Sequence, residues 1–154
     1  MKLAYLLAAA VLLATPAMAA KQAPDPGAHL MHDYALSLPK AKAYDTAYLA
    51  LTTAAKTDKS LQAEIEAASR EHDPTIADTI AKMDHHPRVY AFFQKQGLSK
   101  MEAALLPLIL MDACSGVQYP QVLQTMGDMV SQPQIDFCKA NMAVLKGLHF
   151  FSGK

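Results

Sequence analysis

Histidine supplies the first residues of this sequence that could do chemistry. His29 and His32 are three positions apart, so a helix would place both on one face, and His85 and His86 are adjacent. Neutral imidazole is a common ligand for zinc and copper. The four histidines therefore form a hypothetical site for copper or zinc. The simpler interpretation, which we favour, is solvated histidines at helix ends, because the sequence contains no HExxH or CxxC motif.

Methionine is the second residue type with possible chemistry, and the chain has nine. Met126 and Met129 are spaced like the thioethers that hold Cu(I), which prefers soft ligands. A periplasmic metal-handling protein that uses histidine and methionine ligands is thus an alternative function. Methionine is also an adaptable filler of helical cores and apolar pockets, and this is the favoured interpretation.

Aromatic and acidic residues near the most apolar stretch form another candidate site. The run from Met101 to Cys114 is apolar on nearly every side, which predicts a central helix covered by other helices. Tyr90 and Phe93 precede this run, and Met111 and Asp112 lie within it. If Asp112 is buried near the helix C-terminus, its pKa rises. We predict that these four residues contribute to binding a small apolar ligand.

Sequence motifs of nucleophilic catalysis are absent, because the chain has no GxSxG and no SxxK in a suitable context. The favoured function is therefore a non-enzymatic protein that binds a small apolar molecule or a protein partner, without a cofactor. An enzyme is the least favoured hypothesis, and it would need Asp112 or His85 in a cleft. Neither the ligand nor the oligomeric state follows from the sequence.

The two cysteines, Cys114 and Cys138, form an even pair. Such a pair is expected to bridge in an oxidising compartment. The closed loop of about 25 residues would stabilise the fold by roughly 3 kcal/mol on the chain-entropy model. A pair of buried thiols or soft metal ligands is the alternative.

Residues 1–20 have the features of a secretory signal peptide. Lys2 is followed by the apolar run from Leu3 to Leu13, and Ala17-Met18-Ala19 forms a small-residue cleavage site. That run is shorter than the roughly 20 residues of a membrane-spanning helix. We therefore predict a periplasmic or secreted protein without a transmembrane anchor after signal removal.

Charge composition bears on the class of partner. Fourteen lysine and arginine residues balance fourteen aspartate and glutamate residues, and no basic cluster occurs. This balance argues against binding to nucleic acid.

Apolar periodicity predicts helices throughout the chain after the signal peptide. The first long helix is expected from Leu38 to Lys56, with apolar residues spaced three and four apart. Ser99 followed by Glu102 predicts a capping box, and Gly97 is expected to end the preceding helix. Pro107 is expected to bend the next helix without dividing it.

Other helix boundaries follow from serine, aspartate and proline. Asp73 with Pro74 predicts a helix start, and Ser131 with Gln134 predicts a second capping box. A weaker helix is expected within residues 117–130.

The absence of an alternating strand pattern completes the prediction of the fold. We expect an all-α protein, an irregular bundle of five to seven helices around a central apolar helix hairpin. Residues 37–154 should form a single helical domain, and residues 21–36 a flexible leading segment.

Three short features occur in a fixed order along the chain: Asp33-Tyr34-x-Leu36-Ser37, then His86-Pro87 with Gly97-Leu98-Ser99, then Phe137-Cys138-Lys139-Ala140-Asn141. In these features the sequence resembles an uncharacterised group of small exported helical proteins of Gram-negative bacteria. The resemblance covers most of the chain beyond the signal peptide. It implies the all-α fold and export, and it implies no activity. The resemblance does not imply the pairing of Cys114 with Cys138.

Overall fold

The computed structural model describes residues 25–121 and 129–152. The predicted signal peptide therefore lies outside the described residues, as do residues 122–128, which include Met126 and half of the segment in which the weak helix was expected.

The described residues form eight helices and no strand, which confirms the all-α class. In chain order the helices are α1 (Ala28–His32), α2 (Leu38–Ala55), α3 (Lys59–Arg70), α4 (Ile76–His85), α5 (Pro87–Gln94), α6 (Lys100–Gln118), α8 (Gln132–Leu145) and α9 (His149–Ser152). Eight exceeds the expected five to seven, because α1 and α9 have only five and four residues. Segments this short do not carry a recognisable helical periodicity.

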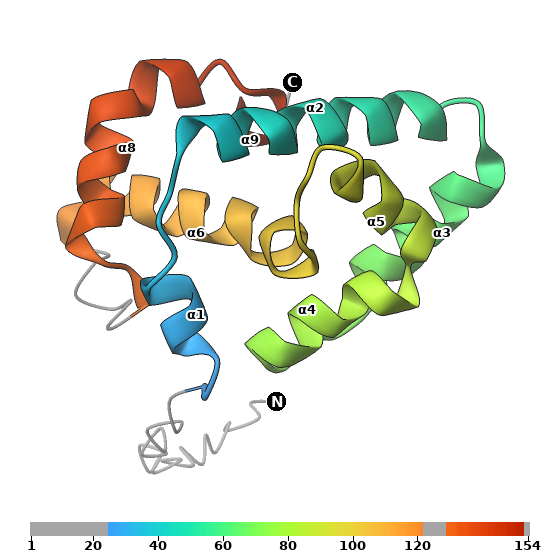
Figure 1. The fold of residues 1–154 in the computed structure, drawn as a ribbon, viewed down its shortest axis with the longest axis horizontal. Coiled ribbons are helices and arrows are strands. Elements are labelled where there is room, and N and C mark those ends of the chain that lie inside the picture. The colour runs from blue at the N-terminus through green and yellow to red at the C-terminus, as the bar shows by residue number, and fades with distance from the viewer. Residues whose placement is uncertain (1–24, 122–128, 153–154) are drawn as a thin grey trace, which may run out of the picture.

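Helix α6 runs across the middle of the molecule (Figure 1). It packs most extensively against α4 and α8 and also contacts α1, α2, α5 and α9. Its large aliphatic side chains at Leu105, Leu106, Ile109 and Leu110 are each at most 1% exposed. Among the described residues, α6 is the one helix long and apolar enough to cross a membrane, and half of it is buried inside the bundle.

The start of α6 is fixed by local hydrogen bonds, as predicted. Glu102 N donates to Ser99 Oγ (3.2 Å), and Ser99 N donates to Glu102 Oε2 (2.8 Å), which forms the capping box. Gly97, just before it, has a φ of 72°, a left-handed conformation that glycine adopts without strain. Pro107 lies inside α6, which continues as one helix on both sides of it.

The start of α4 differs from the prediction by two residues. Thr75, and not Asp73, is the N-cap, because Thr75 and Asp78 form a reciprocal capping box that the sequence reading overlooked. Asp25 adds a long-range cap, since its Oδ2 accepts a hydrogen bond from Ile76 N (2.8 Å). The first described residue is thus bound to the middle of the chain.

The segment predicted to be flexible, residues 21–36, is packed against the bundle from residue 25 onwards. Met31 on α1 is 4% exposed and belongs to an apolar cluster with Leu105. Gln134 Nε2, at the start of α8, donates to the carbonyl oxygens of Met31 (2.6 Å) and Tyr34 (2.9 Å). These contacts connect distant parts of the sequence, so local composition did not reveal them.

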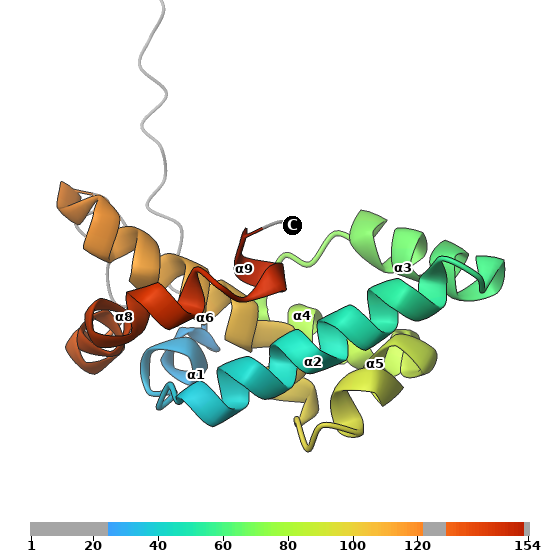
Figure 2. The ribbon, with the colours of Figure 1, turned by 90° about the horizontal axis from the view of Figure 1, so that it is seen from above.

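Helix α2 lies along one side of the bundle, over α5 and α6 (Figure 2). Tyr44 on α2 stacks with Phe93 of α5 and with Phe150 of α9, at ring-centroid distances of 4.9 and 4.8 Å. Asp45 is buried and accepts hydrogen bonds from the backbone N–H of His149 (2.7 Å) and of Phe150 (3.1 Å). These contacts attach the last described helix to α2.

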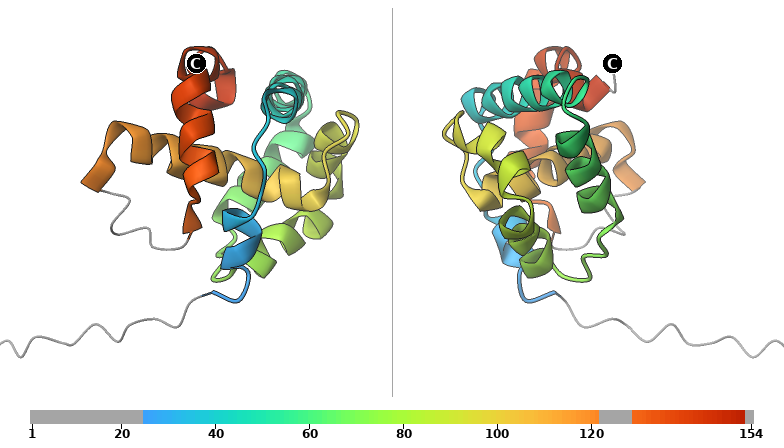
Figure 3. Two further views of the ribbon diagram at one scale, coloured as in Figure 1. Left: turned by 60° about the vertical axis from the view of Figure 1, so that its left-hand side comes forward. Right: turned by 90° about the vertical axis from the view of Figure 1, so that its right-hand side faces the viewer.

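Helix α8 crosses α6 (Figure 3). A disulfide joins Cys114 of α6 to Cys138 of α8, with the two Cα atoms 5.2 Å apart. The predicted bridge is confirmed, and both residues are 0% exposed. The alternative of buried thiols or thiolate metal ligands is therefore wrong.

Candidate functional site

A cleft of about 410 Å³ lies beside the central helix, among α2, α4 and α6. Apolar side chains and small residues make up most of its wall, and a few polar side chains lie among them. The lining residues are Tyr44, Asp73, Thr79, Lys82, Met83, Ala103, Ala104, Pro107 and Leu108. The cleft is thus formed mainly by one face of α4 and the N-terminal half of α6.

The sequence of α6 explains why space remains at this position. Ala103 and Ala104 contribute only methyl groups to the lining, which leaves space beside α6. Pro107 has no N–H, so the carbonyl of Ala103 receives no hydrogen bond from the residue four positions later. Leu108 is 41% exposed and forms an apolar part of the lining.

The polar groups of the cleft are arranged around an ion pair. Lys82 Nζ on α4 contacts Asp73 Oδ2 in the α3–α4 connection, and each side chain is only 16% exposed. Thr79 Oγ1 donates to Thr75 O of its own helix (3.1 Å), which satisfies its hydroxyl group. Burial, with a smaller effect from Tyr48, raises the pKa of Tyr44, which is therefore a neutral phenol at physiological pH. The cleft thus combines a neutral apolar surface with one charged pair.

The four predicted ligand-binding residues do not line this cleft. Phe93 is 4% exposed and supports the cleft indirectly, through its stacking on Tyr44. Tyr90 is half-buried, and its hydroxyl donates to Leu98 O (3.3 Å). The structure therefore places these two aromatic residues in the packing of α5.

Met111 and Asp112 also lie apart from the cleft lining. Met111 is 54% exposed, one turn beyond Leu108 on α6. Asp112 is half-buried, and burial raises the pKa of its carboxyl group. Successive residues of an α-helix point about 100° apart, because a turn contains 3.6 residues. Proximity in sequence therefore did not bring these side chains together.

The predicted histidine ligands are engaged with neighbouring groups. His29 Nδ1 lies 2.8 Å from Pro26 O, and His32 Nδ1 lies 2.8 Å from Asp33 Oδ1. The partner of each imidazole lies within three residues of it in the sequence. The structure shows no shared site for His29 and His32.

His85 and His86 meet at a carboxylate. Glu71 Oε1 lies 2.8 Å from His86 Nε2, and Glu71 Oε2 lies 3.4 Å from His85 Nδ1. The hydrogen bond with His86 is the main reason that the pKa of Glu71 is lowered; partial burial opposes the effect, and His85 adds to it. His86 is only 6% exposed. Its hydrogen bond with Glu71 connects the end of α3 to the corner between α4 and α5.

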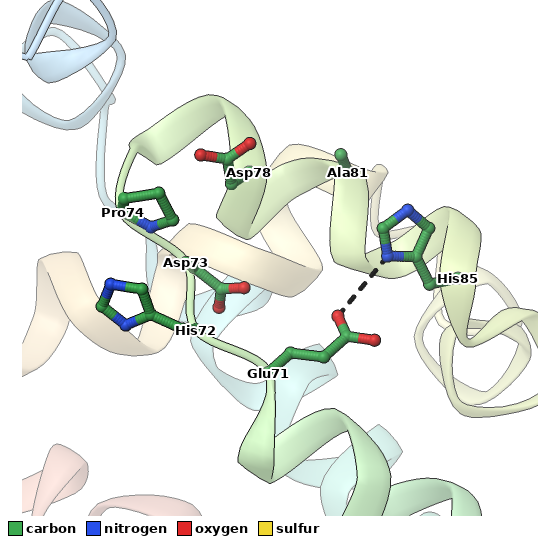
Figure 4. Close-up of a pocket in the computed structure, with 7 residues that line it drawn as sticks. All are labelled: Glu71, His72, Asp73, Pro74, Asp78, Ala81 and His85. Atoms are coloured by element: carbon green, nitrogen blue, oxygen red, sulfur yellow. Dashed lines mark hydrogen bonds and ion pairs between the residues drawn. The ribbon is translucent and has the colours of Figure 1, made fainter.

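A second pocket, of about 340 Å³, lies around His85 (Figure 4). Its lining residues are Glu71, His72, Asp73, Pro74, Asp78, Ala81 and His85. Figure 4 shows His72 and His85 at opposite ends of the pocket. Asp73 pairs with Lys82, and Asp78 belongs to the capping box of α4. Within residues 25–121 and 129–152, no three His, Cys, Asp or Glu side chains form a group that could hold a metal ion.

The fold and the cleft define an all-helical, disulfide-bonded protein with an open, mostly apolar cleft on its central helix. No protein-family model, curated protein or solved structure matches this chain. The residues that sequence reasoning missed are Lys82 and Met83 of α4 and Asp73 before it. The sequence did contain one signal of this site: Lys82 is next to the apolar residue Met83 on α4, so a charged and an apolar side chain lie side by side there.

Proposed function

We propose that the protein is an exported, non-enzymatic binding protein that holds a small apolar molecule in the cleft among α2, α4 and α6. The observation that carries the proposal is the cleft itself. Its volume of about 410 Å³ falls within the range of small-molecule sites, roughly 300–1,000 Å³. Such sites are mostly apolar and contain a few polar groups that orient the ligand.

The lining supports a ligand that is largely hydrocarbon with one hydrogen-bonding group. Met83 offers a flexible thioether side chain that adapts to ligands of different shape. Pro107 and Leu108 offer apolar surface, and Leu108 would lose its exposure when the cleft is filled. A donor on the ligand could reach the Ala103 carbonyl, which has no helical donor from Pro107.

Export is part of the same proposal. The first twenty residues have the composition of a signal peptide, and the Cys114–Cys138 disulfide is consistent with an oxidising compartment. The resemblance to small exported helical proteins supports the same location. The apolar ligand would accordingly be met in the periplasm or outside the cell.

Binding of the apolar fluorescent probe N-phenyl-1-naphthylamine tests the proposal. The chain contains no tryptophan, so probe fluorescence has little protein background. Leu108→Glu places a charge in the cleft lining and removes a side chain whose burial contributes on the order of 1.5 kcal/mol, so its affinity should fall about tenfold or more. Met111→Glu is the matched control, because Met111 is exposed on the same helix outside the lining.

The proposal requires that the unmodified protein and Met111→Glu bind the probe equally and that Leu108→Glu binds it more weakly. Equal binding by all three proteins would place the probe elsewhere on the surface. No fluorescence increase with the unmodified protein would remove the proposed cleft function.

A further inference from the structure

A separate groove lies between the C-terminal end of α2 and residues 59–66 of α3. Its volume is about 510 Å³. These two helices meet at an end of the molecule away from α1 and α8 (Figures 1 and 2). The groove shares no lining residue with the cleft beside α6. It is therefore an independent surface feature.

The floor of the groove is apolar. Ala55 of α2 and Ile65 of α3 are half-buried and line it. Thr52 also lines it, and its hydroxyl donates to Tyr48 O of its own helix (2.9 Å). Since that hydroxyl has its acceptor, the floor requires no polar group from a ligand.

Two lysines border the groove, Lys56 at the end of α2 and Lys59 at the start of α3. Lys59 Nζ contacts the neutral amide of Gln62 (3.2 Å). In the part of the chain that the structure describes, neither lysine forms an ion pair with a carboxylate; the lysines in such pairs are Lys40, Lys82, Lys100 and Lys139. Both ammonium groups are thus available to an anion.

Two carboxylates close to the groove are already engaged. Glu66, on the rim of the groove, pairs with Arg70 (3.6 Å) and accepts from Gln62 Nε2 (3.1 Å). Asp58, the N-cap of α3, accepts from Leu61 N (2.9 Å) and pairs with Arg88 (2.6 Å). The lysines therefore give the groove a positive character.

We propose that the α2–α3 groove binds a small amphipathic monocarboxylate. Its carboxylate would lie between Lys56 and Lys59, and its hydrocarbon part would cover Ala55 and Ile65. Because Glu66 pairs with Arg70, the two lysines present their positive charges to the ligand, and this charge complements a carboxylate. Charge-assisted hydrogen bonds to the ammonium groups provide the specificity for an anion.

Titration of the ¹⁵N-labelled protein with octanoate tests this site by NMR. Octanoate should shift backbone amide signals within residues 52–66 and leave those of residues 79–83 and 103–108 unchanged. Octanol should bind at least about tenfold more weakly, because it lacks the charge. Butyrate should also bind more weakly, because it buries fewer methylene groups, each worth about 0.8 kcal/mol.

Paired variants separate this site from general surface charge. Lys56→Gln with Lys59→Gln should weaken octanoate binding about tenfold or more. Lys42→Gln with Lys146→Gln makes the same change in net charge at two exposed lysines outside the groove and should leave the affinity unchanged. The proposal is overturned if both pairs weaken binding equally, if octanol shifts the signals of residues 52–66 with the same affinity as octanoate, or if the octanoate shifts map elsewhere or are absent.

Discussion

Asp112 shows how a single side chain can oppose the stability of its own helix. It is half-buried on α6, where reduced contact with water disfavours a negative charge. Burial raises the pKa of its carboxyl group above the ordinary value of about 3.9. The folded protein therefore holds this proton at a pH where the unfolded chain has lost it.

Asp112→Asn should consequently stabilise the protein, and the gain should depend on pH. Between the unfolded and the folded pKa of Asp112, the unfolded state binds fewer protons, so the wild-type free energy of unfolding falls as pH rises. Asparagine does not titrate. Urea unfolding should show little difference between the two proteins at about pH 3.5 and a more stable variant at pH 7. A difference that stays the same at both values would contradict this explanation.

The role of a single side chain could be predicted from the sequence when its partner lies within a few residues along the chain. Ser99 and Glu102 were predicted as a capping pair because both partners lie within one helical turn. The pairing of His86 with Glu71 was not predicted, since fifteen residues separate them and only the turn between α3 and α4 brings them together. The candidate site depends on contacts of this second kind.

At the scale of elements, Gln134 carries more than its predicted capping role. Its Oε1 accepts from Ser131 N (2.9 Å), as the start of α8 requires. Its Nε2 reaches the α1–α2 segment and donates to Met31 O and Tyr34 O, and the residue is only 1% exposed. One amide group thus joins the start of α8 to the first described helix.

Gln134→Leu should lower the free energy of unfolding by about 2–4 kcal/mol, because it removes three hydrogen bonds made by one buried amide group. Gln132→Leu is the matched control, since Gln132 is exposed on the same helix and its amide donates to Asp136 Oδ1 (2.8 Å). Its effect should stay within about 0.5 kcal/mol. Urea denaturation measures the free energy of unfolding of both variants. Similar decreases in the two variants would show that the hydrogen bonds of Gln134 do not stabilise the fold.

Helix positions were largely predictable, because periodicity and caps are encoded within each segment. The predicted helix from Leu38 to Lys56 matches α2, which ends at Ala55. The cleft was not predictable in this way, because it depends on how α4 lies against the two alanines of α6. Lys82 and Met83 became parts of a site only through that packing.

At the scale of the whole molecule, the disulfide fixes α8 across the central helix. The two cysteines are 24 positions apart, and the bridge is fully buried between α6 and α8. A closed loop of this length restricts the unfolded chain and stabilises the fold by about 3 kcal/mol on the chain-entropy model.

Replacing Cys114 and Cys138 together by alanine should therefore reduce the free energy of unfolding by about 3 kcal/mol. Circular dichroism should still show a helical protein at low denaturant, because the other contacts of α6 remain. A thiol titration of the unfolded, unreduced wild type provides the companion measurement, and it should find no free thiol. Two free thiols, or an unchanged midpoint in the double variant, would exclude a stabilising bridge.

The hydrogen bond from Ile76 N to Asp25 has a practical consequence for preparing this protein. Cleavage near residue 20, where the signal peptide is predicted to end, would keep Asp25 in the processed chain. Recombinant versions trimmed further, to begin after Asp25, would lose an acceptor at the start of α4, one of the helices that form the cleft. The safe place for an affinity tag or an artificial start is therefore upstream of this aspartate.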